Sequence, residues 1–211
     1  MNVKKYLKKI IPQIATEFYQ NKRNFLQWKK RGFLESSPQI AKQNVFKKYG
    51  IKDASWIETG TYLGTTTNYL SKLFPHVYSI EPEPILYANA CKRFKGKNVT
   101  LFNDVSENVL LSLLPSLNNE SNINFWLDGH YSAGTTFKGN KNCPVEDELE
   151  AIEKTFDNFN KIAILIDDVR LFLPSNSEYP DYPSIDYLVD WARRMNLSWR
   201  IEHDIFIMLK D

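Results

Sequence analysis

The stretch that decides the fold reads Trp56-Ile57-Glu58-Thr59-Gly60-Thr61-Tyr62-Leu63-Gly64-Thr65-Thr66-Thr67. The apolar run 54–57 predicts a strand, the two glycines a turn, and the apolar spacing within 65–74 a helix. A strand, a glycine turn and a helix start place free backbone N–H groups beside a crevice that suits a nucleotide-like ligand. The dinucleotide pattern G-x-G-x-x-G is absent, because Glu58 stands where its first glycine would be. A carboxylate there repels a pyrophosphate and suits a cationic ligand.

Outward from this stretch, strands and helices alternate along the chain. Strands are predicted at 77–81, 99–102, 124–127 and 162–166, helices at 84–94, 107–114, 145–156 and 184–195, and an antiparallel hairpin at 198–209. This alternation predicts an α/β fold, a mostly parallel seven-stranded Rossmann-like sheet with helices on both faces. We expect residues 1–50 to form an N-terminal helical extension or cap and residues 51–211 to form the main domain.

Composition narrows the class of protein. A chain of 211 residues suits one domain with a real core, and no apolar run approaches the ~20 residues of a membrane span. Cys91 and Cys143 are far apart and form no C-x-x-C pair, so neither a disulfide framework nor a zinc site is indicated. The N-terminus, Met1-Asn2-Val3-Lys4-Lys5, lacks the long apolar region of a secretion signal. We expect a soluble, cytoplasmic protein.

The charge is divided unevenly. Residues 1–50 carry 12 Lys/Arg and 2 Asp/Glu, a net charge of +10, whereas residues 51–211 have a net charge of −8. The basic segment suits an anionic partner such as a glycan or a membrane surface. A solvated helical face, a cap over the main domain or a homodimer contact is the alternative. No nucleic-acid motif is present, so we expect no nucleic-acid partner.

Acidic side chains follow successive predicted strands: Glu58, Glu81, Asp104, Asp128 and the pair Asp167-Asp168. The carboxyl ends of parallel strands share one edge of a sheet, so these acids are expected to gather there. Glu81 suits hydrogen bonding to ribose hydroxyls, with helix capping beside Pro82 as the alternative. Asp104 with Ser106 either contacts an adenine ring or caps the following helix.

Three of these carboxylates, Asp128, Asp167 and Asp168, follow two strands that we expect to be neighbours. Unpaired, they would repel one another. A hard divalent cation such as Mg²⁺, which prefers oxygen ligands, removes that repulsion. His130, in a polar loop beside Asp128, is a candidate proton acceptor. Arg170, just past the pair, is the alternative source of positive charge.

These motifs resemble the class I S-adenosylmethionine-dependent methyltransferases from about Trp56 to Leu209. Residues 58–64 match that family's first motif, E-x-G-x-x-x-G, and Glu81 matches its ribose-binding acid. The C-terminal hairpin is similar to the one that distinguishes this fold from nucleotide dehydrogenases. Within the class, the motifs that resemble metal-dependent, macrocin-type sugar O-methyltransferases are Leu127-Asp128-Gly129-His130-Tyr131 and Ile166-Asp167-Asp168.

The resemblance implies a role for each motif. S-adenosylmethionine would be held by Glu58, Thr59, Gly60, Thr61, Tyr62, Thr65, Thr66, Glu81, Asp104, Ser106 and Asp128. Mg²⁺ would be held by Asp128, Asp167 and Asp168. His130, with Asp128 beside it, would take the proton from the acceptor hydroxyl. The acceptor would be contacted by Tyr131, Thr135, Lys141 and Arg170, and the two cationic residues suit an anionic sugar.

Three hypotheses follow. The preferred one is a Mg²⁺-dependent O-methyltransferase acting on a sugar hydroxyl, in a nucleotide-sugar, a surface or capsular glycan, or an antibiotic sugar. The second is a NAD-type nucleotide-dependent oxidoreductase, motivated by the strand, turn and helix and by Glu81, although Glu58 argues against it. The third is a non-catalytic protein whose basic N-terminal helices bind a partner.

Overall fold

The structure is a computed structural model that describes residues 20–33, 35–129, 143–176 and 182–211. The strands are β1 (Ser55–Thr59), β2 (Val77–Ile80), β3 (Val99–Phe102), β4 (Asn122–Leu127), β5 (Lys161–Ile166), β6 (Ser198–Glu202) and β7 (Ile205–Lys210). The helices are α2 (Gln39–Tyr49), α3 (Thr65–Leu70), α4 (Pro84–Phe94), α5 (Ser106–Ser116), α6 (Val145–Glu153) and α7 (Ile185–Arg194). Residues 20–30 are also helical. Two short 3-10 helices are η1 (Phe156–Asn158) and η2 (Val169–Phe172).

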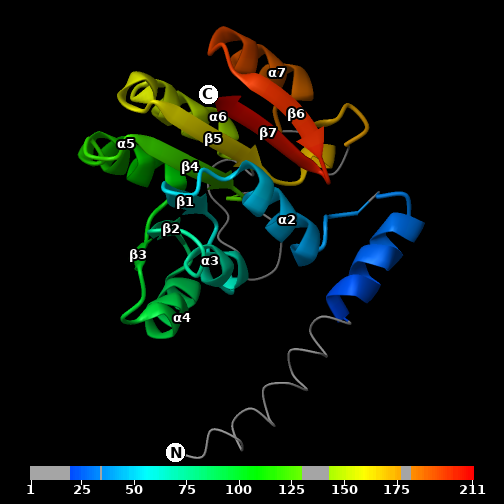
Figure 1. Ribbon diagram of the computed structural model, residues 1–211, viewed down its shortest axis with the longest axis horizontal. Coiled ribbons are helices and arrows are strands. Elements are labelled where there is room, and N and C mark those ends of the chain that lie inside the picture. The colour runs from blue at the N-terminus through cyan, green and yellow to red at the C-terminus, as the bar shows by residue number, and fades with distance from the viewer. Residues whose placement is uncertain (1–19, 34, 130–142, 177–181) are drawn as a thin grey trace, which may run out of the picture.

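The strands form one seven-stranded sheet in the order β3-β2-β1-β4-β5-β7-β6 (Figure 1). Strands β1 to β5 are parallel, whereas β7 runs antiparallel to both of its neighbours, β5 and β6. The predicted fold class is therefore confirmed, including the C-terminal antiparallel hairpin. Because β1 to β5 are parallel, their carboxyl ends lie along one edge of the sheet, where the acidic residues were expected.

Different helices cover the two faces of the sheet, because successive side chains of a strand point to opposite faces. Trp56, Trp126 and Leu165 pack on the face that carries α2 and α3. Ile57 and Phe125 pack on the other face, with α5, α6 and α7. Strands covered on both faces are mostly apolar, as is typical of parallel sheets, and β5 is the clearest case.

Helix α2 is packed firmly onto this sheet. Its residues Ala41, Val45 and Phe46 are buried, and the Phe46 ring centroid lies 5.4 Å from that of Trp56 and 4.8 Å from that of Trp126. Residues 39–49 thus share a core with the strands. The domain boundary that we predicted between residues 50 and 51 stays a prediction.

A buried asparagine joins the segment after α2 to β4. Asn124 accepts the Ile51 N–H at Oδ1, at 2.8 Å, and donates from Nδ2 to the carbonyls of Ile51 and Ala54, at 3.0 and 3.2 Å. Asn124 is fully buried, so these bonds satisfy an amide that would otherwise be costly to desolvate. The approach of the chain to β1 is fixed by this side chain.

The hairpin between β6 and β7 closes through two residues with positive φ, His203 at 55° and Asp204 at 64°. Positive φ at both central residues is typical of the type I′ turn that joins tightly paired strands. The rings of Phe25 and Trp28 lie 6.1 and 5.6 Å from the His203 ring, between centroids. The helix at residues 20–30 therefore rests on this turn, beyond α2 in Figure 1.

The helix boundary that differs most from the prediction is the end of α3, and α6 also ends early, at Glu153 rather than at residue 156. The helix after the glycine turn was expected to reach Phe74, but α3 ends at Leu70. Beyond it, the N–H groups of Lys72 and Leu73 donate to the carbonyls three residues earlier, at 3.2 and 3.0 Å. The chain tightens there into turns, which apolar spacing alone does not distinguish from a continuing helix.

Candidate functional site

The turn after β1 has a shape that requires glycine at its centre. Gly60 has a φ of 86°, and a Cβ added there would lie 2.4 Å from the carbonyl oxygen of Asp128. The N–H groups of Gly60 and Thr61 donate to the carbonyl of Ile80, at 3.0 and 3.1 Å. The turn is therefore packed between the carboxyl ends of β2 and β4, and a side chain at residue 60 would push it away from β4.

Glu81 lies directly after β2 and supports this turn. Its Oε2 accepts the Tyr62 N–H at 2.7 Å, and its Oε1 accepts the Glu83 N–H at 3.0 Å. The side chain of Glu83, not that of Glu81, caps α4 by accepting the Ile85 N–H. Burial raises the pKa of Glu81, and the two backbone donors oppose that shift. Each carboxylate oxygen keeps a second lone pair, so the ribose contact stays a chemically reasonable prediction.

Glu58 lies inside β1, beneath the turn rather than beyond the end of the strand. It is 1% exposed, and its Oε2 accepts hydrogen bonds from the hydroxyls of Thr67 and Ser79, both at 2.6 Å. Burial raises its pKa to about 8, against the effect of these two bonds. Glu58 therefore supports the turn from below. Its direct contact with a cationic ligand stays a prediction.

Replacement of this carboxyl tests its protonation. Between pH 4.5, the ordinary pKa of this carboxyl, and about pH 8, its pKa in the folded protein, folded Glu58 holds a proton that the unfolded chain has released. The stabilisation of the fold by this proton is complete below pH 4.5 and is lost as the pH rises through about 8. Glu58→Gln, which stays neutral, is expected to melt progressively higher than the wild type as the pH rises across this window. Thermal melts against pH check this. The exposed Glu150→Gln variant is the control, and parallel curves for wild type and Glu58→Gln would contradict the prediction.

The threonines of the predicted cofactor site are placed in different ways. Thr59 is buried, and its Oγ1 accepts the Asp128 N–H at 3.1 Å. Thr65 is exposed at the first position of α3, whereas the Thr66 hydroxyl accepts from the side-chain amide of Gln39 at 3.0 Å. Thr66 therefore connects α3 to α2. Contacts of these residues with a cofactor stay predictions.

Asp104 lies just before α5. Its Oδ1 accepts the Val105 N–H at 2.7 Å and the side-chain amide of Asn108 at 3.2 Å. The N-cap residue is Val105, and no side chain caps the helix there, so the capping alternative that the sequence left open is not confirmed. Ser106 is buried at the first helical position. An adenine contact by either residue stays a prediction.

Asp128 and Asp167 meet below α2, because β4 and β5 pair in a register that aligns Trp126 with Leu165. Asp128 and Asp167 follow this aligned pair by two residues, so both carboxylates lie on the same face of the sheet, the one that α2 covers. There the ammonium of Lys42 contacts Oδ2 of Asp167 and lies 3.9 Å from Oδ2 of Asp128. Burial raises the pKa of Asp128 to about 6 and that of Asp167 above its ordinary value, and Lys42 opposes both shifts.

Asp168 is held in a different environment. Its φ is 53°, and its Oδ1 accepts from the Ser36 hydroxyl at 3.0 Å and from the Arg170 guanidinium at 2.6 Å. Arg170 also pairs with Asp204. Arg170 thus neutralises Asp168 through Nη1, which was the alternative to a metal ion, and its contact with a methyl acceptor stays a prediction.

The donor chemistry of the three aspartates suits Mg²⁺, but their arrangement does not. Lys42 lies against Asp167 and Asp128, and Asp168 is paired with Arg170. Within the described part of the chain, no group of three or more His, Cys, Asp or Glu side chains is placed to hold a metal ion. The predicted Mg²⁺ site is therefore not supported, and we assign no chemical step to a metal.

The sequence analysis missed a buried acid on the opposite face of the same edge. Glu148 of α6 is 1% exposed, and its Oε1 has no hydrogen-bond partner among the described residues. A Cβ added at Gly129 would lie 3.2 Å from that oxygen. Burial raises the pKa of Glu148 to about 7. A signal was present, because Glu148 interrupts the apolar stripe of α6, formed by Val145, Leu149 and Ile152.

Four predicted site residues lie outside the described ranges. They are the proposed base His130 and the proposed acceptor contacts Tyr131, Thr135 and Lys141. Their roles stay predictions. Gly129, which precedes them, lies at the carboxyl edge of the sheet, and Cys143, which follows them, lies beside α6.

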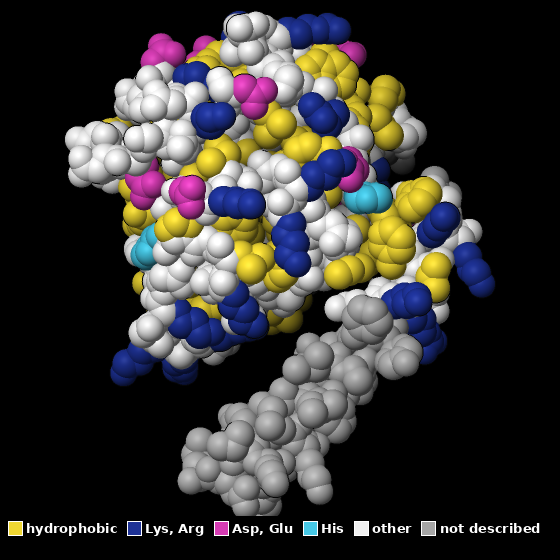
Figure 2. Space-filling model, in the orientation of Figure 1, with side chains coloured by type: hydrophobic (Ala, Val, Ile, Leu, Met, Phe, Trp, Pro, Cys, Tyr) yellow, Lys and Arg dark blue, Asp and Glu magenta, His cyan; other side chains and the backbone are white. Residues whose placement is uncertain are grey.

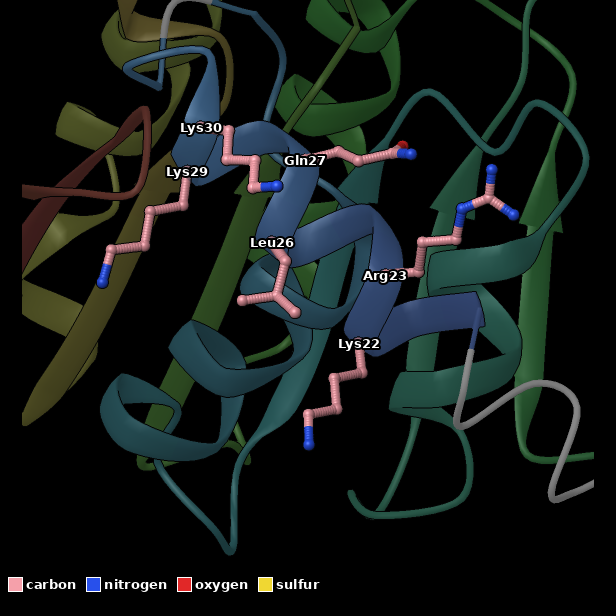
Figure 3. Close-up of a pocket in the computed structure, with 6 residues that line it drawn as sticks. All are labelled: Lys22, Arg23, Leu26, Gln27, Lys29 and Lys30. Atoms are coloured by element: carbon pink, nitrogen blue, oxygen red, sulfur yellow. The ribbon is translucent and has the colours of Figure 1, made fainter.

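Apart from Lys42, the basic N-terminal segment carries exposed cationic side chains, such as Lys22, Arg23, Lys29 and Lys30. Lysines and arginines are spread over the face that carries α2 and the helix at 20–30 (Figure 2). A hollow of about 830 Å³ runs along that helix (Figure 3). It is lined by Lys22, Arg23, Leu26, Gln27, Lys29 and Lys30. No helix in the described ranges is long and apolar enough to cross a membrane. An anionic partner for this segment stays a prediction.

No protein-family model matches the chain, and no curated protein matches it. Among solved structures, an rRNA methylase from Streptococcus thermophilus is 15% identical, with a TM-score of 0.44, over 80% of this chain and 92% of its own. A candidate methyltransferase from Streptococcus mutans, solved with SAH, is 16% identical, with a TM-score of 0.47, over 83% and 97%. A precorrin-6y C5,15-methyltransferase from Geobacter metallireducens is 12% identical, with a TM-score of 0.48, over 79% and 86%. At these low values, the fold assignment rests on the strand order of the sheet itself.

Proposed function

We propose that this protein is an S-adenosylmethionine-dependent methyltransferase that transfers a methyl group to a hydroxyl of a sugar. The observation that carries the proposal is the strand order β3-β2-β1-β4-β5-β7-β6, with β7 antiparallel. Dinucleotide-binding sheets share the first five positions but have the order 3-2-1-4-5-6. The inserted antiparallel strand, together with Glu58 in place of a glycine, favours a methyl donor over NAD.

The carboxyl edge offers a set of groups that suits this donor. Gly60 lets the turn approach β4 closely, and Glu81 lies beside the turn with lone pairs available for ribose hydroxyls. We infer that the turn holds the amino-acid end, that Glu81 holds the ribose, and that Ser106 borders the adenine. When bound, S-adenosylmethionine supplies an electrophilic methyl group on a sulfonium. The work of the chain is then to orient an acceptor oxygen toward that methyl.

The acceptor side is proposed to lie at Asp128. Its side chain is 29% exposed, whereas that of the neighbouring Asp167 is 1% exposed, so Asp128 is the carboxylate that an acceptor can reach. It is therefore one candidate for taking the hydroxyl proton, beside His130. The choice of a sugar rests on the resemblance of residues 127–131 and 166–168 to sugar O-methyltransferases.

Calorimetric titration of the full-length protein tests the cofactor. We expect S-adenosylhomocysteine to bind one site per chain and to raise the melting temperature, since a ligand at ~100 times its Kd stabilises by about 2.7 kcal/mol. We expect NADH to produce neither effect. Binding of NADH without S-adenosylhomocysteine would support the oxidoreductase. Binding of neither would support a non-catalytic role for the basic N-terminal segment. Mass spectrometry of sugar acceptors incubated with the methyl donor then tests transfer.

A further inference from the structure

Lys42 is a charged side chain that enters the carboxyl edge from outside the sheet, on the face that carries α2. It lies on α2, its side chain is 12% exposed, and its ammonium stands 5.4 Å from the Trp126 ring centroid while it contacts Asp167. Burial alone would lower the pKa of this ammonium, but Asp167 and Asp128 together raise it. Lys42 is therefore a charged group enclosed between an aromatic ring and two carboxylates.

The position of Lys42 is fixed by its neighbours on α2. Ala41 and Val45 are fully buried, and Gln39 donates from its side-chain amide to Thr66 on α3. The helix therefore cannot slide along the sheet without opening this core. Among the described residues, Asp167 Oδ1 is enclosed and has no hydrogen-bond partner, so the ammonium at Oδ2 supplies the compensation that this carboxylate receives.

We propose that Lys42 is the resident cation of the Asp128–Asp167 pair, in the place where a metal-dependent sugar O-methyltransferase holds a divalent ion. The proposal rests on the proposed function, which it deepens by naming the positive charge beside the acceptor. Arg170 completes the arrangement, because it pairs with the third carboxylate, Asp168. Lys42 acts as a positioning residue, since it orients Asp128 and Asp167 rather than touching the methyl group.

Titration with Mn²⁺, followed by electron paramagnetic resonance, tests whether the pair accepts a metal. Four full-length proteins are compared: wild type, Lys42→Met, Lys42→Arg and Lys48→Met. Lys48 is a matched control, because it lies on the same helix and pairs with Glu202 at 2.7 Å on the exposed surface. We expect the wild type, Lys42→Arg and Lys48→Met to bind no Mn²⁺ at this site. Lys42→Met is expected to gain one site, since two carboxylates lose their cation.

Melting temperature gives a second measurement. Removing one partner of a buried ion pair is costly, so Lys42→Met is expected to melt on the order of 10 °C below the wild type. Lys48→Met, at an exposed pair, is expected to melt within about 2 °C of it. If Lys42→Met cannot be purified while Lys42→Arg can, the need for a positive charge at residue 42 is supported in another way.

Two results would overturn the proposal. One is stoichiometric Mn²⁺ binding by the wild type that Asp167→Asn removes. The other is a Lys42→Met variant that matches Lys48→Met in both Mn²⁺ binding and melting temperature. Affinity for S-adenosylhomocysteine is measured on the same preparations. Its absence in the wild type would count against the proposed function, whereas the Mn²⁺ result bears on Lys42 alone.

Discussion

A Glu81→Ala variant is expected to bind S-adenosylhomocysteine at least about 100-fold more weakly than the wild type, because hydrogen bonds to a charged acceptor contribute roughly 1.5–3 kcal/mol each. The substitution removes the carboxylate proposed to accept from two ribose hydroxyls. It also leaves the N–H groups of Tyr62 and Glu83 without their acceptor, so the turn loses support on the ligand side. Both losses are expected to weaken the binding of S-adenosylhomocysteine.

Titration calorimetry on Glu81→Ala and Glu81→Gln measures this effect. The glutamine keeps the size of the side chain and one acceptor oxygen. The affinity of Glu81→Gln for S-adenosylhomocysteine is therefore expected to lie between those of the wild type and Glu81→Ala. Glu83→Ala is the matched control, since it removes the same charge two residues away, where the side chain only caps α4. Equal affinities for Glu81→Ala and Glu83→Ala would show that Glu81 makes no special contact with the ligand.

A Gly60→Ala variant is expected to lose about 2–4 kcal/mol of unfolding free energy, with a fall in melting temperature of roughly 5–15 °C. Part of the loss comes from the φ of 86°, which an L side chain rarely adopts. The rest comes from the 2.4 Å approach of the new Cβ to the Asp128 carbonyl, a backbone atom that cannot turn aside. Affinity for S-adenosylhomocysteine is expected to fall as well, because the turn and the end of β4 would be forced apart.

Gly96→Ala separates the two causes. Gly96 has a similar φ of 75°, but a Cβ there would meet nothing within 4 Å. Its loss of stability therefore measures the cost of the backbone conformation alone. Chemical denaturation measures the unfolding free energy that each variant loses. We attribute the larger loss expected for Gly60→Ala to the close packing of the turn against β4. If the two variants lose the same stability, that close packing contributes nothing.

The architecture was predictable because its determinants are local. The run Ile162–Ile166 is apolar at every position, which requires a strand covered on both faces, and alternation with helices then requires parallel pairing. The end of α3 was not predictable, because residues 71–74 keep the apolar spacing of a helix while the chain forms turns. The role of Asp104 was not predictable either, because its residue type allowed a helix cap and an adenine contact equally.

The site was predictable only in part, because its contacts join distant segments. Parallel strands placed Asp128 and Asp167 at one edge without further information. Lys42, however, is 125 residues from Asp167, in a segment whose many lysines all look alike in the sequence. Only the packing of Val45 and Phe46 on the sheet selects this one lysine. The position of Glu148 was marked by the apolar residues around it, but an acid in the first turn of a helix also has a simpler explanation.

The interior position of β7 has a consequence for biosynthesis. This strand pairs with β5 on one edge and β6 on the other, although it follows both in the chain. A ribosome therefore releases β5 and β6 before the strand that joins them exists. Until residues 205–210 emerge, the apolar edge of β5 is open to pairing with other chains. The nascent protein thus passes through a stage in which an unpaired strand edge exposes it to aggregation.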